Sequence, residues 1–135
     1  MFDTDLTRVY ALALLAIARA DGEIDAAEGA RLEERIRART QSDLELADLL
    51  LAEPVSPAQL FQAVDESPFR GSGVTSQQLA GWLVADALDV ILEKGHASGS
   101  EGRLLEAYAR ALGLSRDEVR RVAGNLARWI PEEEM

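Results

Sequence analysis

Apolar side chains recur along this chain at helical spacing. From Leu6 the first run places apolar residues at i, i+3, i+4, i+7 and i+11, which is one face of a helix. Neighbouring leucines make this helix, expected over residues 5–20, apolar nearly all round, so it should be central. No window alternates with period two for long enough to make a strand, and β-branched residues are few. The pattern predicts an all-α protein.

Six further helices are predicted from their start and stop signals. Each opens on a capping residue that is followed three residues later by Glu or Gln, the pattern of a capping box. Gly22, Gly95 and Gly113 stand where helices should end, and Pro54 and Pro131 cannot continue one. The expected ranges are about 25–39, 42–53, 57–66, 75–95, 98–113 and 115–129.

The chain also resembles itself at an offset of 73 residues. From Leu12 to Glu45, 10 of 34 positions are identical to the residue 73 places later, among them Gly22 and Glu28. A repeated unit of this kind fixes how a chain is divided. We therefore expect a single-domain bundle of about seven helices over 1–135, built from a pseudo-duplicated three-helix unit. Its halves are 4–52 and 75–130, joined by the helix 57–66 and the loop 67–74.

Composition and charge exclude several classes of function. A net charge of -10 repels phosphate backbones and anionic lipid, so neither nucleic-acid binding nor membrane insertion is expected, whereas cations and basic proteins suit the charge. The apolar run 11–18 is far short of the roughly 20 residues that cross a bilayer. Asp3 and Asp5 stand where an export signal would be basic, which favours the cytoplasm. The absence of Cys and of a nucleophile motif predicts a protein that is not an enzyme.

The turn between the first two helices gathers four carboxylates: Asp21, Glu23, Asp25 and Glu28. Such oxygen ligands suit calcium, magnesium or manganese, although the spacing is not that of an EF-hand loop. Asp25 and Glu28 also have the spacing of a capping box, so helix capping alone would explain both. The sequence leaves these two interpretations open.

The acidic character of this turn is weaker in the second half. Lys94 stands where the first turn has Asp21, and Ser98 replaces Asp25, whereas Glu101 is kept in place of Glu28. The second turn also holds the single histidine, His96, but one His without Cys seldom makes a zinc site.

Two groups of charged side chains need a partner or solvent. Asp86 falls on the apolar face of the helix 75–95, where we expect a solvated edge, with a cation or an arginine partner as the alternative. The arginines 31, 35, 37 and 39 are expected to form a solvated face of the helix 25–39, in which Glu33 and Arg37 have i,i+4 spacing.

Several of these features together resemble the tellurite-resistance TerB-like family. They are a long apolar helix that ends in the residues 20–25, then Glu28, a second apolar helix, an acidic turn, and Leu-Gly-Leu-Ser at 112–115; the match spans about 6–122. The resemblance implies a cytoplasmic bundle of about seven helices, used as an accessory module in stress or metal-resistance systems. It also implies a divalent cation held by acidic residues of both turns. Residue by residue, these are Asp21, Asp25, Glu28 and Glu101.

Two hypotheses of function follow. The first is a non-catalytic TerB-like domain that binds a divalent cation weakly in a metal or stress response. The second is a protein-interaction adaptor, in which the acidic turns only cap helices and a groove between the halves receives a partner protein. Phe69 or Trp129 would contribute to that groove.

Overall fold

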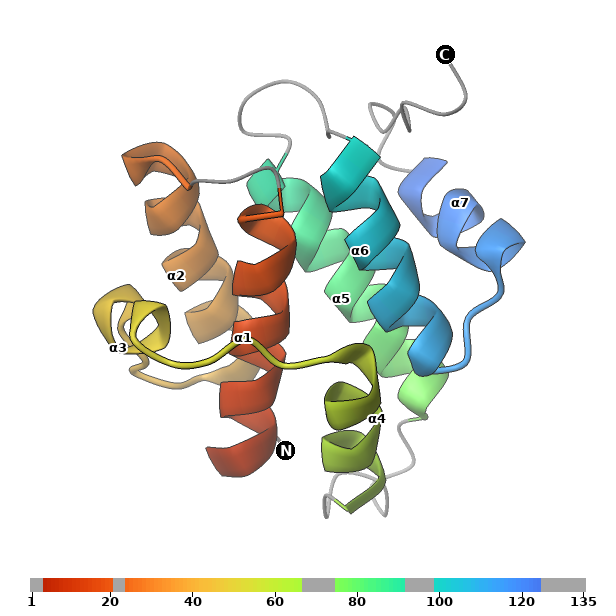
Figure 1. Ribbon diagram of the computed structural model, residues 1–135, viewed down its shortest axis with the longest axis horizontal. Helices are drawn as coiled ribbons and strands as arrows, with labels where there is room; N and C mark the ends of the chain where they lie inside the picture. Colours follow the sequence, from red (N-terminus) through yellow and green to blue (C-terminus); the bar gives the residue numbers. More distant parts are fainter. Residues whose placement is uncertain (1–3, 21–23, 67–74, 92–98, 125–135) are drawn as a thin grey trace.

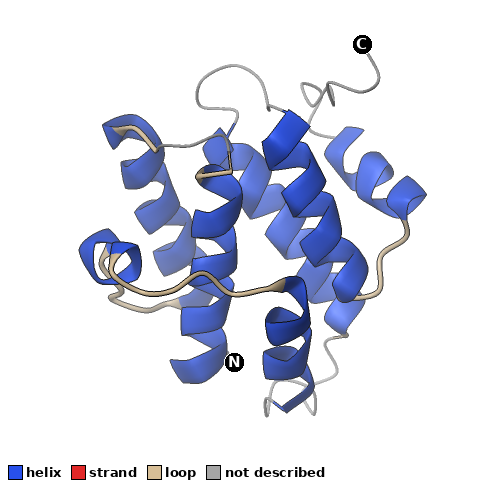
Figure 2. Cartoon of the chain, viewed as in Figure 1, coloured by secondary structure: helices blue, strands red, loops and turns tan. Residues whose placement is uncertain are grey.

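The computed structural model describes residues 4–20, 24–66, 75–91 and 99–124 of the chain. Seven α-helices form the regular structure of this described part, and it contains no strand (Figure 1, Figure 2). The predicted all-α class and the number of helices are confirmed. The helices are α1 (Thr4–Ala18), α2 (Ala26–Thr40), α3 (Leu46–Leu50), α4 (Pro57–Glu66), α5 (Ser76–Ile91), α6 (Gly99–Ala111) and α7 (Arg116–Gly124).

Helix α1 lies at the centre of the bundle, as its apolar sequence predicts. It contacts α2 on one side and α6 on the other, with α4 and α5 as further neighbours (Figure 1). Leu6, Tyr10 and Ile17 are fully buried on the predicted face, and the adjacent leucines are buried too. No described helix is long and apolar enough to cross a bilayer.

Most of the described caps form as the sequence predicts. In the first, the Glu28 backbone N–H donates to Asp25 Oδ1 at 2.7 Å, and the Asp25 backbone N–H donates to Glu28 Oε1 at 3.5 Å. Gly113 ends α6 with a φ of 105°, a conformation that glycine adopts without strain. The same reciprocal bonds join Ser56 to Gln59, Thr75 to Gln78 and Ser115 to Glu118.

The predicted helix 42–53 is wrong at both ends. Helix α3 begins only at Leu46 and ends at Leu50, and Ser42 does not cap it. Instead, the Ser42 hydroxyl bonds Thr40 Oγ1 at 2.8 Å, and Glu33 of α2 accepts from the Leu46 backbone N–H at 3.0 Å. A side chain from a neighbouring helix therefore takes over the capping role, which a local sequence signal cannot reveal.

The pseudo-duplication of the three-helix unit stays a prediction. The segment 92–98, which would hold the second copy of the acidic turn, lies outside the described residues. The predicted ends at Gly22, Gly95 and Pro131, the cap Ser98, and the side chains of His96, Phe69 and Trp129 lie outside the described residues.

Candidate functional site

The carboxylates expected to bind a cation occupy different environments. Asp25 is exposed at the start of α2, whereas Glu28 and Glu101 are buried in the first turns of α2 and α6. Asp21 lies outside the described residues. In the described part of the chain, no three acidic or histidine side chains form a cluster that could hold a metal ion. The cation site therefore stays a prediction.

Asp25 and Glu28 are engaged in helix capping. One oxygen of each carboxylate accepts a backbone N–H of the other residue. Both negative charges also lie at the positive end of the α2 dipole, which stabilises them. The capping interpretation of this turn is thus confirmed for Asp25 and Glu28.

A network of polar side chains surrounds the buried Asp86 of α5. Its side chain is 0% exposed, so the expected solvated edge is wrong and the arginine alternative is right. Arg35 Nη2 lies 2.5 Å from Oδ1, and Arg39 donates from Nε to Oδ2 at 2.9 Å and from Nη2 to Oδ1 at 3.0 Å. Tyr10 of α1 donates its hydroxyl proton to Oδ2 at 2.5 Å. We call Asp86, Tyr10, Arg35 and Arg39 the Asp86 cluster.

Helix α2 contributes a stripe of arginines to this contact rather than the expected solvated face. Arg31 Nε lies 3.3 Å from Asp89 Oδ2, and Arg35 lies between Asp86 and Asp89. Arg39 also lies over the ring of Trp82, 5.1 Å from its centroid, at a distance suited to a cation–π interaction. The spacing i, i+4 and i+8 of the arginines was the sequence signal for this stripe. The predicted pair of Glu33 with Arg37, at 3.6 Å, forms on the helix surface, and so does a pair of Arg31 with Glu34 at 3.9 Å.

The cluster changes the acidity of its members. Burial is the largest cause that raises the pKa of Tyr10 well above its ordinary value, and the Asp86 charge adds to it. The hydrogen bond to Asp86 raises the pKa of Arg39. Tyr10 is therefore neutral and Arg39 charged at neutral pH. Both side chains thus act as hydrogen-bond donors to Asp86.

A second buried tyrosine fixes the connector 51–56 between α3 and α4. Tyr108 of α6 donates its hydroxyl proton to the backbone carbonyl of Val55. Burial raises the pKa of Tyr108 to about 12. In Figure 1 the connector crosses in front of α1. Ala52 and Pro54 of the connector line a groove there.

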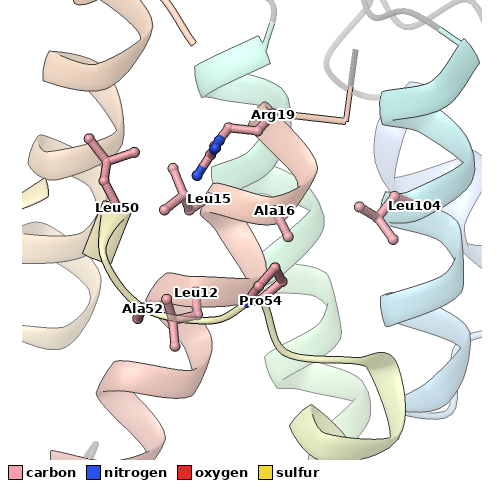
Figure 3. Close-up of a pocket in the computed structure, with 8 residues that line it drawn as sticks. All are labelled: Leu12, Leu15, Ala16, Arg19, Leu50, Ala52, Pro54 and Leu104. Carbon is pink, nitrogen blue, oxygen red and sulfur yellow. The ribbon is translucent and has the colours of Figure 1, made fainter. Parts of the chain in front are cut away.

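The groove, which we call the α1 groove, has a volume of about 470 Å³. Figure 3 shows its floor on α1, with Leu50 of α3 on one side and Leu104 of α6 on the other. Most of its lining comes from the first half of the chain, Pro54 comes from the connector and Leu104 from the second half, and the adaptor hypothesis stays a prediction. The lining consists of seven apolar residues and one cation: Leu12, Leu15, Ala16, Leu50, Ala52, Pro54, Leu104 and Arg19.

An exposed apolar surface adjoins this groove at the end of α3. Leu50 is 42% exposed and Leu51 is 88% exposed. Exposed carboxylates surround the two leucines in the sequence, and the whole segment 43–66 contains six acidic residues and no Lys or Arg. We call this region the α3 surface; it comprises Leu50, Leu51, Asp43, Glu45, Asp48 and Glu53.

No protein-family model matches this chain, and neither the curated proteins nor the solved structures contain a significant match. The resemblance to TerB-like proteins therefore stays a prediction.

Proposed function

We propose that this chain is a non-catalytic helical adaptor that binds a basic protein partner at the α3 surface. The observation that carries the proposal is the 88% exposure of Leu51 beside a second exposed leucine. Covering apolar surface contributes about 25 cal/mol per Å², so a partner that buries both side chains gains binding free energy there. Apolar anchors inside a polar rim are typical of protein-binding sites.

The charge of the α3 surface defines its partner. Four exposed carboxylates flank the leucines, and no basic residue occurs between positions 43 and 66. Complementary charge steers association and excludes wrong partners, so a segment with one or two apolar anchors and neighbouring Lys or Arg fits best. Because these carboxylates are exposed, we expect the association rate to fall as salt is added.

Binding to a purified partner tests this proposal. The partner is captured from native lysate, identified, purified and titrated against the wild-type chain. We expect Leu50→Ser with Leu51→Ser to weaken binding at least tenfold, and Asp48→Lys with Glu53→Lys to slow association. Phe61→Ser is the matched control, because Phe61 is 46% exposed on α4 outside the α3 surface. A captured partner that binds both double variants as tightly as the wild type, or the capture of no protein, would overturn the proposal.

Weak cation binding at the first acidic turn is the second proposal. It is supported by the exposure of Asp25, of which only Oδ1 takes part in the cap. Asn caps a helix about as well as Asp, and a capping box accepts Gln in place of Glu. Asp25→Asn with Glu28→Gln should therefore keep the helix and remove the charges. Calorimetric titration with calcium or manganese should give millimolar or tighter binding to the wild type and none to the variant.

A further inference from the structure

The α1 groove combines an apolar lining with a single positive charge. Its floor is a stripe at helical spacing i, i+3, i+4 and i+7, from Leu12 to Arg19, which extends about 10 Å along the helix axis. Helical bonding continues to the end of the stripe, since the Arg19 backbone N–H donates to the Leu15 carbonyl at 3.0 Å. The groove is therefore elongated, with its cation at one end.

We propose that the α1 groove binds a straight-chain monocarboxylate, a ligand of the fatty-acid class. Its carboxylate would pair with Arg19, and its alkyl chain would extend over Leu15 and Leu12 towards Pro54. Figure 3 shows Arg19 at one end of the groove, with its guanidinium beside Leu15, and Ala52 and Pro54 at the other end.

The size of the groove and its recessed floor favour a slender ligand. Small-molecule sites have volumes of about 300–1,000 Å³ and mostly apolar linings, and the 470 Å³ of this groove lies in that range. Leu12 is 5% exposed and Leu15 is 3% exposed, so only a narrow strip of the floor is accessible. An alkyl chain can reach it, whereas a protein segment meets the more exposed Leu51 first.

The positive charge of Arg19 in the groove favours a ligand with a negatively charged head group. Arg19 is exposed, and the structure records no ion pair between it and a carboxylate of the described residues. One guanidinium pairs well with one carboxylate through two parallel hydrogen bonds. A net charge of -10 repels ligands with several negative charges, which disfavours phosphates and nucleotides. A monoanion with an apolar body matches both features.

This inference goes beyond the proposed adaptor function and does not rest on it. The ligand occupies the recessed groove, whereas the protein partner covers Leu51, which is not part of the groove lining. Leu50 belongs to both. A failure of one proposal therefore leaves the other standing.

A chain-length series is the main test. The full chain is titrated calorimetrically with hexanoate, octanoate, decanoate and dodecanoate below their micelle concentrations. Burial of each added methylene should strengthen binding by up to about fourfold, until the groove is filled and the affinity levels off. Methyl NMR shifts of Leu12, Leu15 and Leu104 should saturate at one ligand per chain. Absence of saturable binding overturns the proposal.

Two comparisons test the placement of the carboxylate. Arg19→Gln should weaken decanoate binding about three- to tenfold, as expected for a partly exposed charged pair, and leave decanol binding unchanged. Arg110→Gln is the matched control, since Arg110 is an exposed arginine of α6 outside the lining. Equal affinity of the wild type for decanoate and decanol would overturn carboxylate recognition.

The α3 surface provides the last control. Leu51→Ser should leave decanoate binding unchanged, because Leu51 does not line the groove. Loss of binding in Leu51→Ser together with normal binding in Arg19→Gln would place the ligand on the exposed leucines and overturn the proposal. Ala16→Leu, which adds volume to the lining, should instead shorten the longest chain that the groove accepts.

Discussion

Two helix contacts at matching places in the chain are built from opposite chemistry. Helix α2 meets α5 through the Asp86 cluster, in which one buried carboxylate accepts from two arginines and a tyrosine. Helix α6 meets α1 in a second contact between the halves, and the positions 73 residues away from the cluster hold one tyrosine and three apolar residues, all buried. These positions are Ala13, Leu83, Tyr108 and Leu112.

The difference indicates that burial at these positions does not require charge. Three apolar residues and one tyrosine are buried at the corresponding positions, so we expect the Asp86 cluster to contribute more than burial. Desolvation of buried ions costs free energy that their attraction only partly returns. Hydrogen bonds from two guanidinium groups are directional, however, and set the orientation of α2 relative to α5. We infer that the cluster specifies the α2–α5 geometry more than it stabilises the fold.

The largest expected effect comes from removing the acceptor alone. Asp86→Ala should lower the free energy of unfolding by about 3 kcal/mol, because two arginines and a tyrosine hydroxyl then lose their common partner. Urea unfolding followed by circular dichroism measures the change. A loss below about 1 kcal/mol would mean that the guanidinium groups simply turn to water.

Replacing the whole cluster by its apolar counterpart should reverse most of that loss. The variant Tyr10→Leu, Arg35→Tyr, Arg39→Leu, Asp86→Ala carries at each position the residue found 73 places away. Exchange of a buried ion cluster for packed apolar residues is often neutral, so we expect about 2 kcal/mol of stability to return relative to Asp86→Ala. A variant less stable than Asp86→Ala would show that the two contacts are not equivalent.

Single hydroxyl deletions compare the two buried tyrosines. Tyr10→Phe removes the bond to Asp86 and Tyr108→Phe removes the bond to the Val55 carbonyl. We expect each to cost about 1 kcal/mol, with Tyr10→Phe the larger because its acceptor is charged. Equal losses in thermal unfolding would argue against a special contribution from the Asp86 charge.

Alkaline pH should weaken the fold through the same two tyrosines. Both pKa values are raised on folding, that of Tyr108 to about 12, so the unfolded chain loses these protons first as the pH rises. The stability they contribute is present below pH about 10, the ordinary tyrosine value, and falls as the pH rises above it. Unfolding measured between pH 9 and pH 12 should show a shallower decline in the double variant Tyr10→Phe, Tyr108→Phe.

The smallest effect is expected at the first acidic turn. Asp25→Asn with Glu28→Gln should change the free energy of unfolding by less than about 0.5 kcal/mol, since the capping pattern survives. Asp25→Ala should cost about 1 kcal/mol, because the side-chain acceptor is lost. If the neutral double variant costs as much as Asp25→Ala, then charge rather than hydrogen bonding holds the start of α2.

The sequence predicted most of the described caps from pairs of local partners. Pairs such as Ser56 with Gln59 and Ser115 with Glu118 lie three residues apart, and their bonds depend on backbone geometry alone. The predicted cap at Ser42 is wrong, because Glu33 of α2 accepts the backbone N–H at the start of α3. A contact between residues thirteen positions apart competes with the local one, and only packing decides between them.

The candidate sites were predictable to different degrees. Asp86 was visible as a charge on an apolar helix face, and an arginine partner was among the expected explanations, but which arginines would meet it was not fixed. The α1 groove draws on α1, α3, the connector and α6, so its lining could not be read from any one stretch. The exposure of Leu51 was equally hidden, because in the sequence it continues an apolar run of α3.

The sequence by itself determined the helical class, the central place of α1 and most described helix starts, because these follow from the spacing of residues within a few turns. Tertiary structure decided which charges are buried and which leucines face solvent. Asp86 and the arginines of α2 lie about fifty residues apart, and their pairing depends on how α2 packs on α5. Local spacing fixes a helix, whereas the environment of a side chain depends on the neighbours that folding brings to it.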